Sequence, residues 1–258
     1  GSSNAARLTP PGGLAFSGLT NQVGVIDVDN NNLLKLIPLG NVAEDVVATP
    51  DNTRAYVAMA GPGFSGTDDP FAGIAVVDTI RLEVVNRIPL PRGIWRLAVD
   101  PSGKYLYAAG GGSYVYVSNI DPESRRFHQT DSPIEKPRER LLTDGLAVSP
   151  DGRRLFVSTY ERLRLNGNVV VFNIDPEDPA SAGRPMVNDI NLTLHGGKWH
   201  PGEIVPVDST RFLVTPVPHH TISQPFVFTF TATDEHSTDY QIDFFRTNLS
   251  SPEQTGAL

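Results

Sequence analysis

Short runs of apolar residues recur along the whole chain and are separated by turn-forming residues. Some runs are nearly continuous in apolar residues, such as 24–27 and 145–148, and others alternate with polar residues, such as 33–39 and 84–90. Continuous runs are typical of strands buried on both faces, whereas alternation is typical of a strand with one solvated face. The pattern therefore predicts many short β-strands and no helix longer than about two turns.

The runs belong to a repeated unit. Three landmarks recur in order at an offset of 51 residues: 25–27 as 76–78, 37–39 as 88–90, and Tyr56 as Tyr107. Less regular copies match 97–107 with 145–157 and 117–123 with 171–177, and a divergent copy follows at 204–214. Each unit has the pattern of four short strands, with a Pro-Asp-Gly type of turn after the first. Such repetition predicts stacked units of one architecture.

The predicted fold class is all-β, a β-propeller of four-stranded antiparallel blades. We expect residues 1–12 to be a tag remnant and lead-in, 13–248 to form the propeller, and 249–258 to be a tail. The blade-like units span residues 13–39, 45–90, 94–131, 145–194 and 202–246. Five such units can close a ring, because propellers have four to eight blades. A propeller that is incomplete or split between chains is an alternative.

The two ends of the repeat differ from its middle. The first unit is expected to lack a second strand, because only seven residues separate Ser17 from Val25. At the other end, 226–231 and 240–245 alternate as strands do. They are predicted to be the outer strands of the fifth blade, and the alternative is the opening hairpin of an immunoglobulin-like module. We expect the first and last units either to pack on each other or to be covered by other residues or chains.

The repeat resembles the YVTN family of β-propeller repeats. That family carries a strand, a Ser-Pro-Asp-Gly turn, a Tyr-Val strand and a Val-Ile-Asp strand, which Asp51, Asp151, 56–57 and 25–27 match. The resemblance covers roughly residues 13–215. It implies a bacterial or archaeal protein that is secreted, periplasmic or on the cell surface. It implies little about function, because propellers serve as enzymes, binding modules and spacers.

Composition narrows the classes of partner. The formal net charge of −8 argues against nucleic acid and anionic membranes, which bind basic surfaces. The one local group of basic residues, 136–140, alternates with glutamates and is expected to be a solvated loop. With no cysteine, the chain has no disulfide, thiolate metal site or cysteine nucleophile. No apolar run is long enough for a transmembrane helix, so we expect no membrane insertion.

Four of the six histidines fall in loops that a propeller would place on one rim. They are His195, His200, His219 and His220. Neutral imidazoles that converge on one point suit a divalent or transition metal such as zinc, copper or iron. The alternative is exposed histidines that bind only water, because no acidic residue completes a spaced motif nearby. No cofactor is indicated beyond this possible metal.

Further loop residues on the same predicted face are candidates for contact with a partner. They are Asp68, Asp69, Tyr160, Arg162 and Trp199. Acidic loop residues suit calcium or a basic partner, and arginine beside tyrosine often anchors a protein partner. The alternative for the acids is ordinary solvation, because no calcium-binding loop motif is present.

Two functional hypotheses follow. The first is a non-enzymatic binding or scaffold propeller that engages a protein or a glycan, or another chain that completes the ring. The second is a propeller enzyme, similar to a lactonase or an oxidoreductase, that uses the histidine rim. A pure spacer is a third possibility. No nucleophile elbow, phosphate-binding loop or zinc-protease motif occurs in the sequence.

Overall fold

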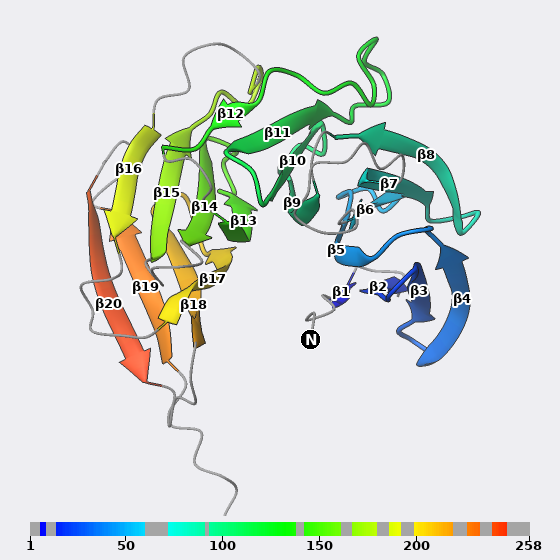
Figure 1. Cartoon of the computed structure of the whole chain (residues 1–258), viewed down its shortest axis with the longest axis horizontal. Helices are drawn as coiled ribbons and strands as arrows, with labels where there is room; N and C mark the ends of the chain where they lie inside the picture. Colours follow the sequence, from blue (N-terminus) through cyan, green and yellow to red (C-terminus); the bar gives the residue numbers. More distant parts are fainter. Residues whose placement is uncertain are drawn as a thin grey trace, which may run out of the picture.

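The described part of the chain folds into five four-stranded sheets (Figure 1). Every pairing within them is antiparallel and joins strands that follow each other in sequence. We call the sheets blades 1 to 5 in chain order. The computed structural model describes residues 6–8, 14–59, 72–90, 93–137, 142–160, 167–179, 186–191, 199–218, 226–232 and 239–246.

Each blade takes its strands from one continuous part of the sequence. Blade 1 contains β1 (Ala6–Leu8), β2 (Leu14–Gly18), β3 (Gln22–Asp27) and β4 (Asn32–Pro38). Blade 2 contains β5 (Ala43–Ala48), β6 (Arg54–Met59), β7 (Gly73–Asp78) and β8 (Glu83–Pro89). Blade 3 contains β9 (Ile94–Val99), β10 (Tyr105–Gly110), β11 (Tyr114–Asn119) and β12 (Ile134–Glu135). Blade 4 contains β13 (Leu142–Val148), β14 (Arg154–Tyr160), β15 (Gly167–Asn173) and β16 (Met186–Asn191). Blade 5 contains β17 (Trp199–Pro206), β18 (Arg211–Pro218), β19 (Phe226–Ala232) and β20 (Tyr240–Arg246).

Aspartates of the repeat fix the turn between the first and second strands. Asp51 accepts hydrogen bonds from the Thr49 hydroxyl at 2.5 Å and from the Thr53 backbone N–H at 3.0 Å. Gly103 and Gly152 occupy the corresponding turns of blades 3 and 4 with φ of 73° and 74°, which glycine adopts without strain. The predicted Pro-Asp turns are therefore present, and the aspartate replaces solvent as the acceptor for the turn.

The aspartate that ends the third strand has the same role at the next turn. The Asp78 carboxylate accepts the backbone N–H groups of Arg81 at 2.8 Å and Ile80 at 2.9 Å. These bonds, with the Arg81 bond first, lower the pKa of Asp78. Asp27 has an equivalent role in blade 1. The Val-Ile-Asp landmark of the repeat therefore combines a buried strand with a side chain that closes its turn.

Four apolar seams join the five blades. The seam between blades 1 and 2 contains Val25 and Val77, and that between blades 2 and 3 contains Tyr56 and Ile94. The other two seams join blades 3 to 4 and 4 to 5. Their largest members include Tyr107, Phe172, Phe156, Phe212 and Phe230. Because each seam takes side chains from two sheets, the blades are stable only as a stack.

Most of the core expected from the sequence is buried. Val25, Val76, Val77, Leu146, Val170 and Val171 are at most 3% exposed. Ile26, Val99 and Val148, which were also expected in the core, are only partly buried. Val99 and Val148 border a seam, whereas Ile26 lies on a face of blade 1 that no other blade covers. The expectation was wrong for Ile26 because strand periodicity does not show which blade has a neighbour.

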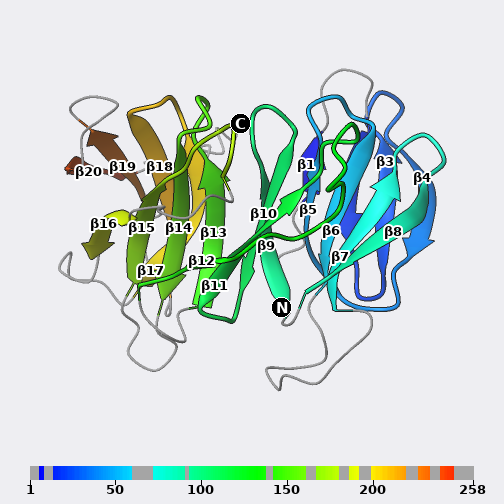
Figure 2. The same ribbon diagram turned by 90° about the horizontal axis from the view of Figure 1, so that it is seen from above.

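The stack forms an open arc. Figure 1 shows the five sheets side by side around a common centre, with β1, β5, β9, β13 and β17 on the inner edge. Strands of each blade pack against those of the next, whereas no packing of that extent joins blade 5 to blade 1 within the described residues. Figure 2 shows the strands running between the two flat sides of the arc. Blades 1 and 5 therefore do not close a ring on each other.

The structure corrects the expected organisation of blade 1. The segment expected as a lead-in contributes strand β1, which pairs with β2. The run expected as the opening strand is β2, so the blade has four strands and lacks none. A three-residue strand is too short to show periodicity, which is why the sequence pattern missed it. At the other end, β19 and β20 are outer strands of blade 5, as predicted.

Two boundaries and one local environment also differ. Blade 3 extends to Glu135, because β12 is its outer strand. Lys136 is only 2% exposed, although it was expected in a solvated loop. The residues after Pro137, up to 141, lie outside the described part. No helix that could cross a bilayer occurs in the residues that the structure describes.

Candidate functional site

The inner strands of blades 2 to 5 share an irregularity. Each pairs with its neighbour through a register shift near its beginning. The extra residues at these β-bulges are Glu44 in β5, Trp95 in β9, Asp144 in β13, and Gly202 with Glu203 in β17. A bulge redirects side chains out of the regular alternation, and bulges are frequent beside functional sites. We call Glu44, Trp95, Asp144 and Glu203 the bulge row.

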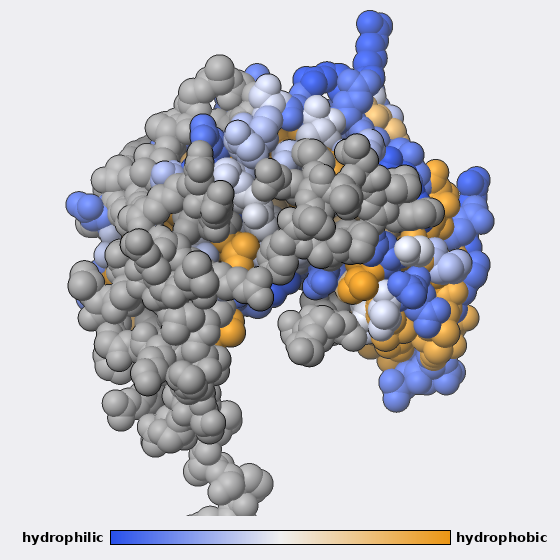
Figure 3. Space-filling model, viewed as in Figure 1, coloured by the Kyte–Doolittle hydropathy of each residue, from blue (hydrophilic) through white to orange (hydrophobic). Residues whose placement is uncertain are grey.

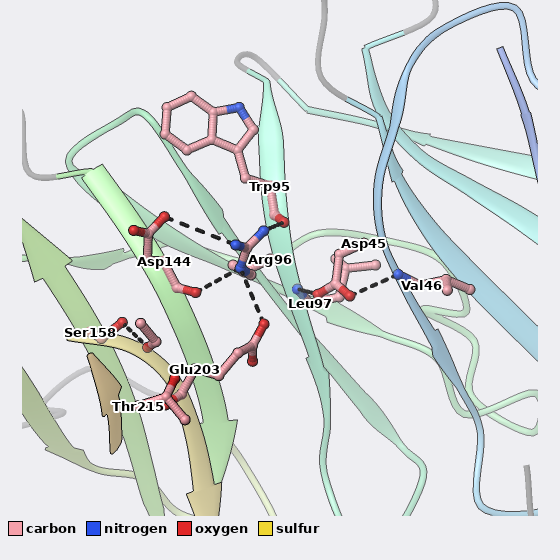
Figure 4. Close-up of polar contacts among 10 residues, drawn as sticks. Asp45, Val46, Trp95, Arg96, Leu97, Asp144, Ser158, Glu203 and Thr215 are labelled. Atoms are coloured by element: carbon pink, nitrogen blue, oxygen red, sulfur yellow. Dashed lines mark hydrogen bonds and ion pairs between the residues drawn. The ribbon is translucent and has the colours of Figure 1, made fainter. Parts of the chain in front are cut away.

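Arg96 joins members of the bulge row across three blades (Figure 4). Its Nε donates to the Asp144 carbonyl oxygen at 2.7 Å, and its Nη1 donates to the Trp95 carbonyl oxygen at 2.8 Å. Nε also lies 3.7 Å from Glu203 Oε1, and Nη2 lies 4.0 Å from Asp144 Oδ1. The guanidinium therefore binds the carbonyl groups of the extra residues in two bulges. Its side chain is 17% exposed, which strengthens these charge-assisted bonds relative to a surface pair.

Asp45 forms the equivalent link between blades 2 and 3. Its side chain is buried, with 2% of the residue exposed. Oδ2 accepts the backbone N–H of Leu97 at 2.9 Å, and Oδ1 accepts the N–H of Val46 at 2.8 Å. Asp45 therefore holds two inner strands in register, beside the bulge that redirects Glu44. It supports the site and does not contact solvent as Glu44 does.

Blades 4 and 5 are in close contact beside the bulges of β13 and β17. The Ser158 hydroxyl donates to the Gly202 carbonyl oxygen at 2.7 Å. A Cβ atom on Gly145 would lie 2.2 Å from that same oxygen, so only glycine fits here. This contact lies next to the bulges at Asp144 and Glu203 and joins the two blades there.

The bulge row has an excess of negative charge. Asp144 and Glu203 lie within 4.0 Å of the Arg96 guanidinium, Glu44 adds a third carboxylate to the row, and Trp95 is partly exposed. The side chains of Asp144 and Glu203 are 20% and 47% exposed. Carboxylates and an aromatic face together favour a cationic group, through ion pairing and the ring quadrupole.

A buried cation lies behind this row. The Nζ atom of Lys136 donates to the Thr143 hydroxyl at 3.0 Å and lies 3.4 Å from the Gly110 carbonyl oxygen. Burial lowers the pKa of Lys136 to about 7. The ammonium thus lies between the end of β10 and the start of β13.

The residues predicted from the sequence fall at the same end of the blades, as far as their backbone is described. Tyr160 ends β14 and pairs with Leu142 at the start of β13. Trp199 and His200 open β17. These strand ends lie at the end of blades 4 and 5 where β13 and β17 begin, and a shared site for these residues stays a prediction. The other predicted site residues lie outside the described residues: His195, His219, His220, Asp68, Asp69 and Arg162.

No group of three or more metal-ligating side chains occurs within the described ranges, which omit the side chains of the predicted histidine rim. The sequence reasoning missed Trp95, Arg96, Asp144 and Glu203. A signal was present, because polar or aromatic residues interrupt the start of each inner strand. A search for apolar periodicity ends the strand at such a residue, so the bulge is not detected.

Comparison with known proteins places the fold. No family model matches the chain. The structure resembles Kuenenia stuttgartiensis hydrazine synthase with a TM-score of 0.69, at 17% identity over 94% of this chain and 65% of that one. It also resembles the β-propeller domain of Myceliophteria thermophila Cps50 (Swd1), with a TM-score of 0.58 and 11% identity, over 94% of this chain and 70% of that one. The fold is that of a β-propeller.

A sequence relative occurs in a bacterium. It is the uncharacterised protein YwhL of Bacillus subtilis strain 168, which is 33% identical over 124 residues. The match covers 36% of this chain and 27% of that protein. The solved structures show the fold alone, since their identities are low. The resemblance to the YVTN repeats stays a prediction.

Proposed function

We propose that this propeller is a non-enzymatic binding domain that holds a partner protein at the end of the blades where the bulge row lies. The observation that carries the proposal is the row itself: inner strands of four consecutive blades each carry a bulge at the same end. The packing of the blades does not by itself require acidic or aromatic side chains at these positions. Their chemistry suits a basic segment of the partner.

The sequence leaves a glycan as a second class of partner for the same face. An aromatic ring such as Trp95 can stack on a sugar, but the three carboxylates of the row favour a cationic ligand. We further propose, from the resemblance to the YVTN repeats, that the domain acts outside the cytoplasm.

Fluorescence of Trp95 tests the proposal. The chain has two tryptophans, so Trp199→Phe leaves Trp95 as the only reporter. We expect peptides rich in lysine or arginine to change its emission saturably, and added salt to weaken the effect. Peptides of the same length with acidic side chains and neutral oligosaccharides should have no effect.

A double variant gives the matched control. Glu44→Gln with Glu203→Gln should weaken binding of the basic peptide about tenfold or more, since it removes two of the three carboxylate charges of the bulge row. Glu123→Gln removes an exposed charge far along blade 3 and should leave binding unchanged. Equal binding by the double variant, or a saturable response to oligosaccharides alone, would contradict a basic protein partner.

The second candidate is a metal-dependent propeller enzyme that uses the predicted histidine rim. The observation that favours it is the backbone position of His200, at the start of β17 near the bulge row. Elemental analysis of protein purified without chelators tests this candidate. Stoichiometric zinc, copper or iron that is lost in His200→Ala would support it, and substoichiometric metal would exclude the histidine site.

A further inference from the structure

The face of blade 1 that points away from blade 2 is apolar and uncovered. The pairings place Leu33 beside Ile26, and Leu36 beside Gly24, on that face. Leu33 is 58% exposed and Leu36 is 44% exposed. A Cβ on Gly24 would lie 3.6 Å from a Leu33 methyl and 3.7 Å from a Leu36 methyl, so the two leucines converge over the glycine. Figure 3 shows hydrophobic residues gathered over this part of the molecule, at the lower right.

The same positions are buried in blade 2. At the 51-residue offset, Ile26 corresponds to Val77 and Leu33 to Val84. Val77 is fully buried in the seam against blade 1, and Val84 packs at its edge. Blade 1 therefore presents to solvent the side-chain row that its neighbour uses to make a seam.

Blade 5 also has a face that no other blade covers within the described part of the chain, on the side away from blade 4. Cross-strand pairing aligns Val205, Leu213 and Thr229 on the side away from blade 4. The equivalent row of blade 4 is Ala147, Phe156 and Val171, which is buried in the seam with blade 5. Val205 is 52% exposed, and Val217 on the same side is 36% exposed. Each end of the arc thus exposes the face that the inner blades use to pack against a neighbour.

The matched propellers indicate what fits between the two ends. Five blades of this chain correspond to 70% of the Swd1 propeller domain and to 65% of the hydrazine synthase chain. The remainder of the Swd1 domain equals about two blades of the present size, which gives a ring within the usual range of four to eight.

We propose that the free faces of blades 1 and 5 together bind one further run of about two propeller blades, which completes the ring. The occupant is a β-sheet because each established seam is made by the same chemistry, branched and aromatic side chains from two antiparallel sheets. A second copy would bring the total to about ten blades, beyond the range that propellers close. Thr229 and Asp243 on the blade 5 face make a lipid surface unsuitable.

The first test uses the chain as it stands. By light scattering, we expect a monomer. An apolar dye such as anilinonaphthalene sulfonate should bind it, and Leu33→Asp with Leu36→Asp should reduce the dye emission several-fold. Ile80→Asp is the matched control, because Ile80 is 85% exposed in the β7–β8 turn and lies on no seam face. A dimer that the leucine variant dissociates, or absence of dye binding, would overturn the proposal.

The second test supplies the occupant. A copy of residues 43–135, which carries blades 2 and 3, is attached by a flexible linker after residue 258 of the full chain. We expect amide hydrogen exchange in β3 and β4 to slow about tenfold or more and dye binding to be lost. The leucine variant should abolish the slowing of exchange, and Ile80→Asp should retain both effects. Added blades that fold, as judged by increased strand signal, while β3 and β4 exchange as before would refute the docking surface.

Discussion

Gly145 and Gly202 meet across the seam between blades 4 and 5, where a Cβ on Gly145 would lie 2.2 Å from the Gly202 carbonyl oxygen. That oxygen also accepts the Ser158 hydroxyl. Two strands from different sheets are therefore in backbone contact at this point. The contact requires a residue with no side chain in β13.

Gly145→Ala should destabilise the protein by about 1–3 kcal/mol, because the added methyl must displace backbone. Gly24→Ala is the control, since its Cβ meets only leucine methyls at 3.6 Å and beyond. The control should be neutral or slightly stabilising, as replacing glycine in a strand lowers the entropy of the unfolded chain. Urea unfolding curves measure both. Equal stability of the two variants would show that β13 and β17 can separate without cost.

Asp45→Ala should cost about 1–3 kcal/mol, because the buried backbone N–H groups of Val46 and Leu97 lose their acceptor. Asp45→Asn should cost less, because one amide oxygen still accepts a hydrogen bond. Chemical denaturation gives both values. If the asparagine variant is as damaged as the alanine variant, the charge and not the number of acceptors is decisive.

His128 links blade 3 to blade 2 in its neutral form. The Asn86 amide donates to Nδ1 at 2.6 Å, so Nε2 carries the proton and contacts the Tyr56 hydroxyl at 3.1 Å. Phe127 stacks on the ring, and Arg54 lies over Phe127. Burial, followed by the Arg54 charge, lowers the pKa of His128 to about 4.

This His128 contribution to stability should be complete above pH 6.5 and should decline as the pH falls from 6.5 to about 4, because the unfolded chain then binds the extra proton. After allowance for solvent screening, the change is on the order of 1 kcal/mol. Thermal melts of the wild type and His128→Gln at several pH values measure it. A constant difference between the two proteins across this range would contradict the neutral link.

Lys136 changes stability in the same direction as His128, but in a higher pH window. Because burial lowers its pKa from 10.5 to about 7, the folded protein holds fewer protons than the unfolded chain between these values. The wild type should therefore gain stability relative to Lys136→Met as the pH rises from 7 to 10.5, by on the order of 3 kcal/mol. Below pH 7 the difference should be flat. Denaturation at pH 6, 8 and 10 provides the comparison, and a flat difference throughout would show that the ammonium is solvated in the folded state.

The sequence repeat predicted the blades, but the sequence pattern did not predict most residues of the candidate site. Val25 and Val77 recur at a fixed offset, and burial on both faces leaves an apolar run that can be counted. Asp144 and Arg96 are different, because their positions depend on a register shift between paired strands. A register shift is a property of two strands together. The sequence of either strand alone does not show it.

The ends of the arc were only partly predictable for a related reason. The Leu33 row has the same pattern as its counterpart in blade 2, so nothing in the strand itself marks it as exposed. The absence of a partner is visible only when all the seams are placed. Strand β1 was missed because its pairing with β2, and not its own three residues, defines it.

The bulges have a consequence for how new specificity can arise in this protein. An extra residue in an inner strand has no register partner in the neighbouring strand, so its side chain does not belong to the seam rows. Positions 44 and 95 can therefore accept many different residues while the neighbouring blades stay packed. If the bulge row binds the proposed partner, variation confined to these positions would change the ligand from one homologue to another at little thermodynamic cost, much as loop variation diversifies an antibody on a constant framework.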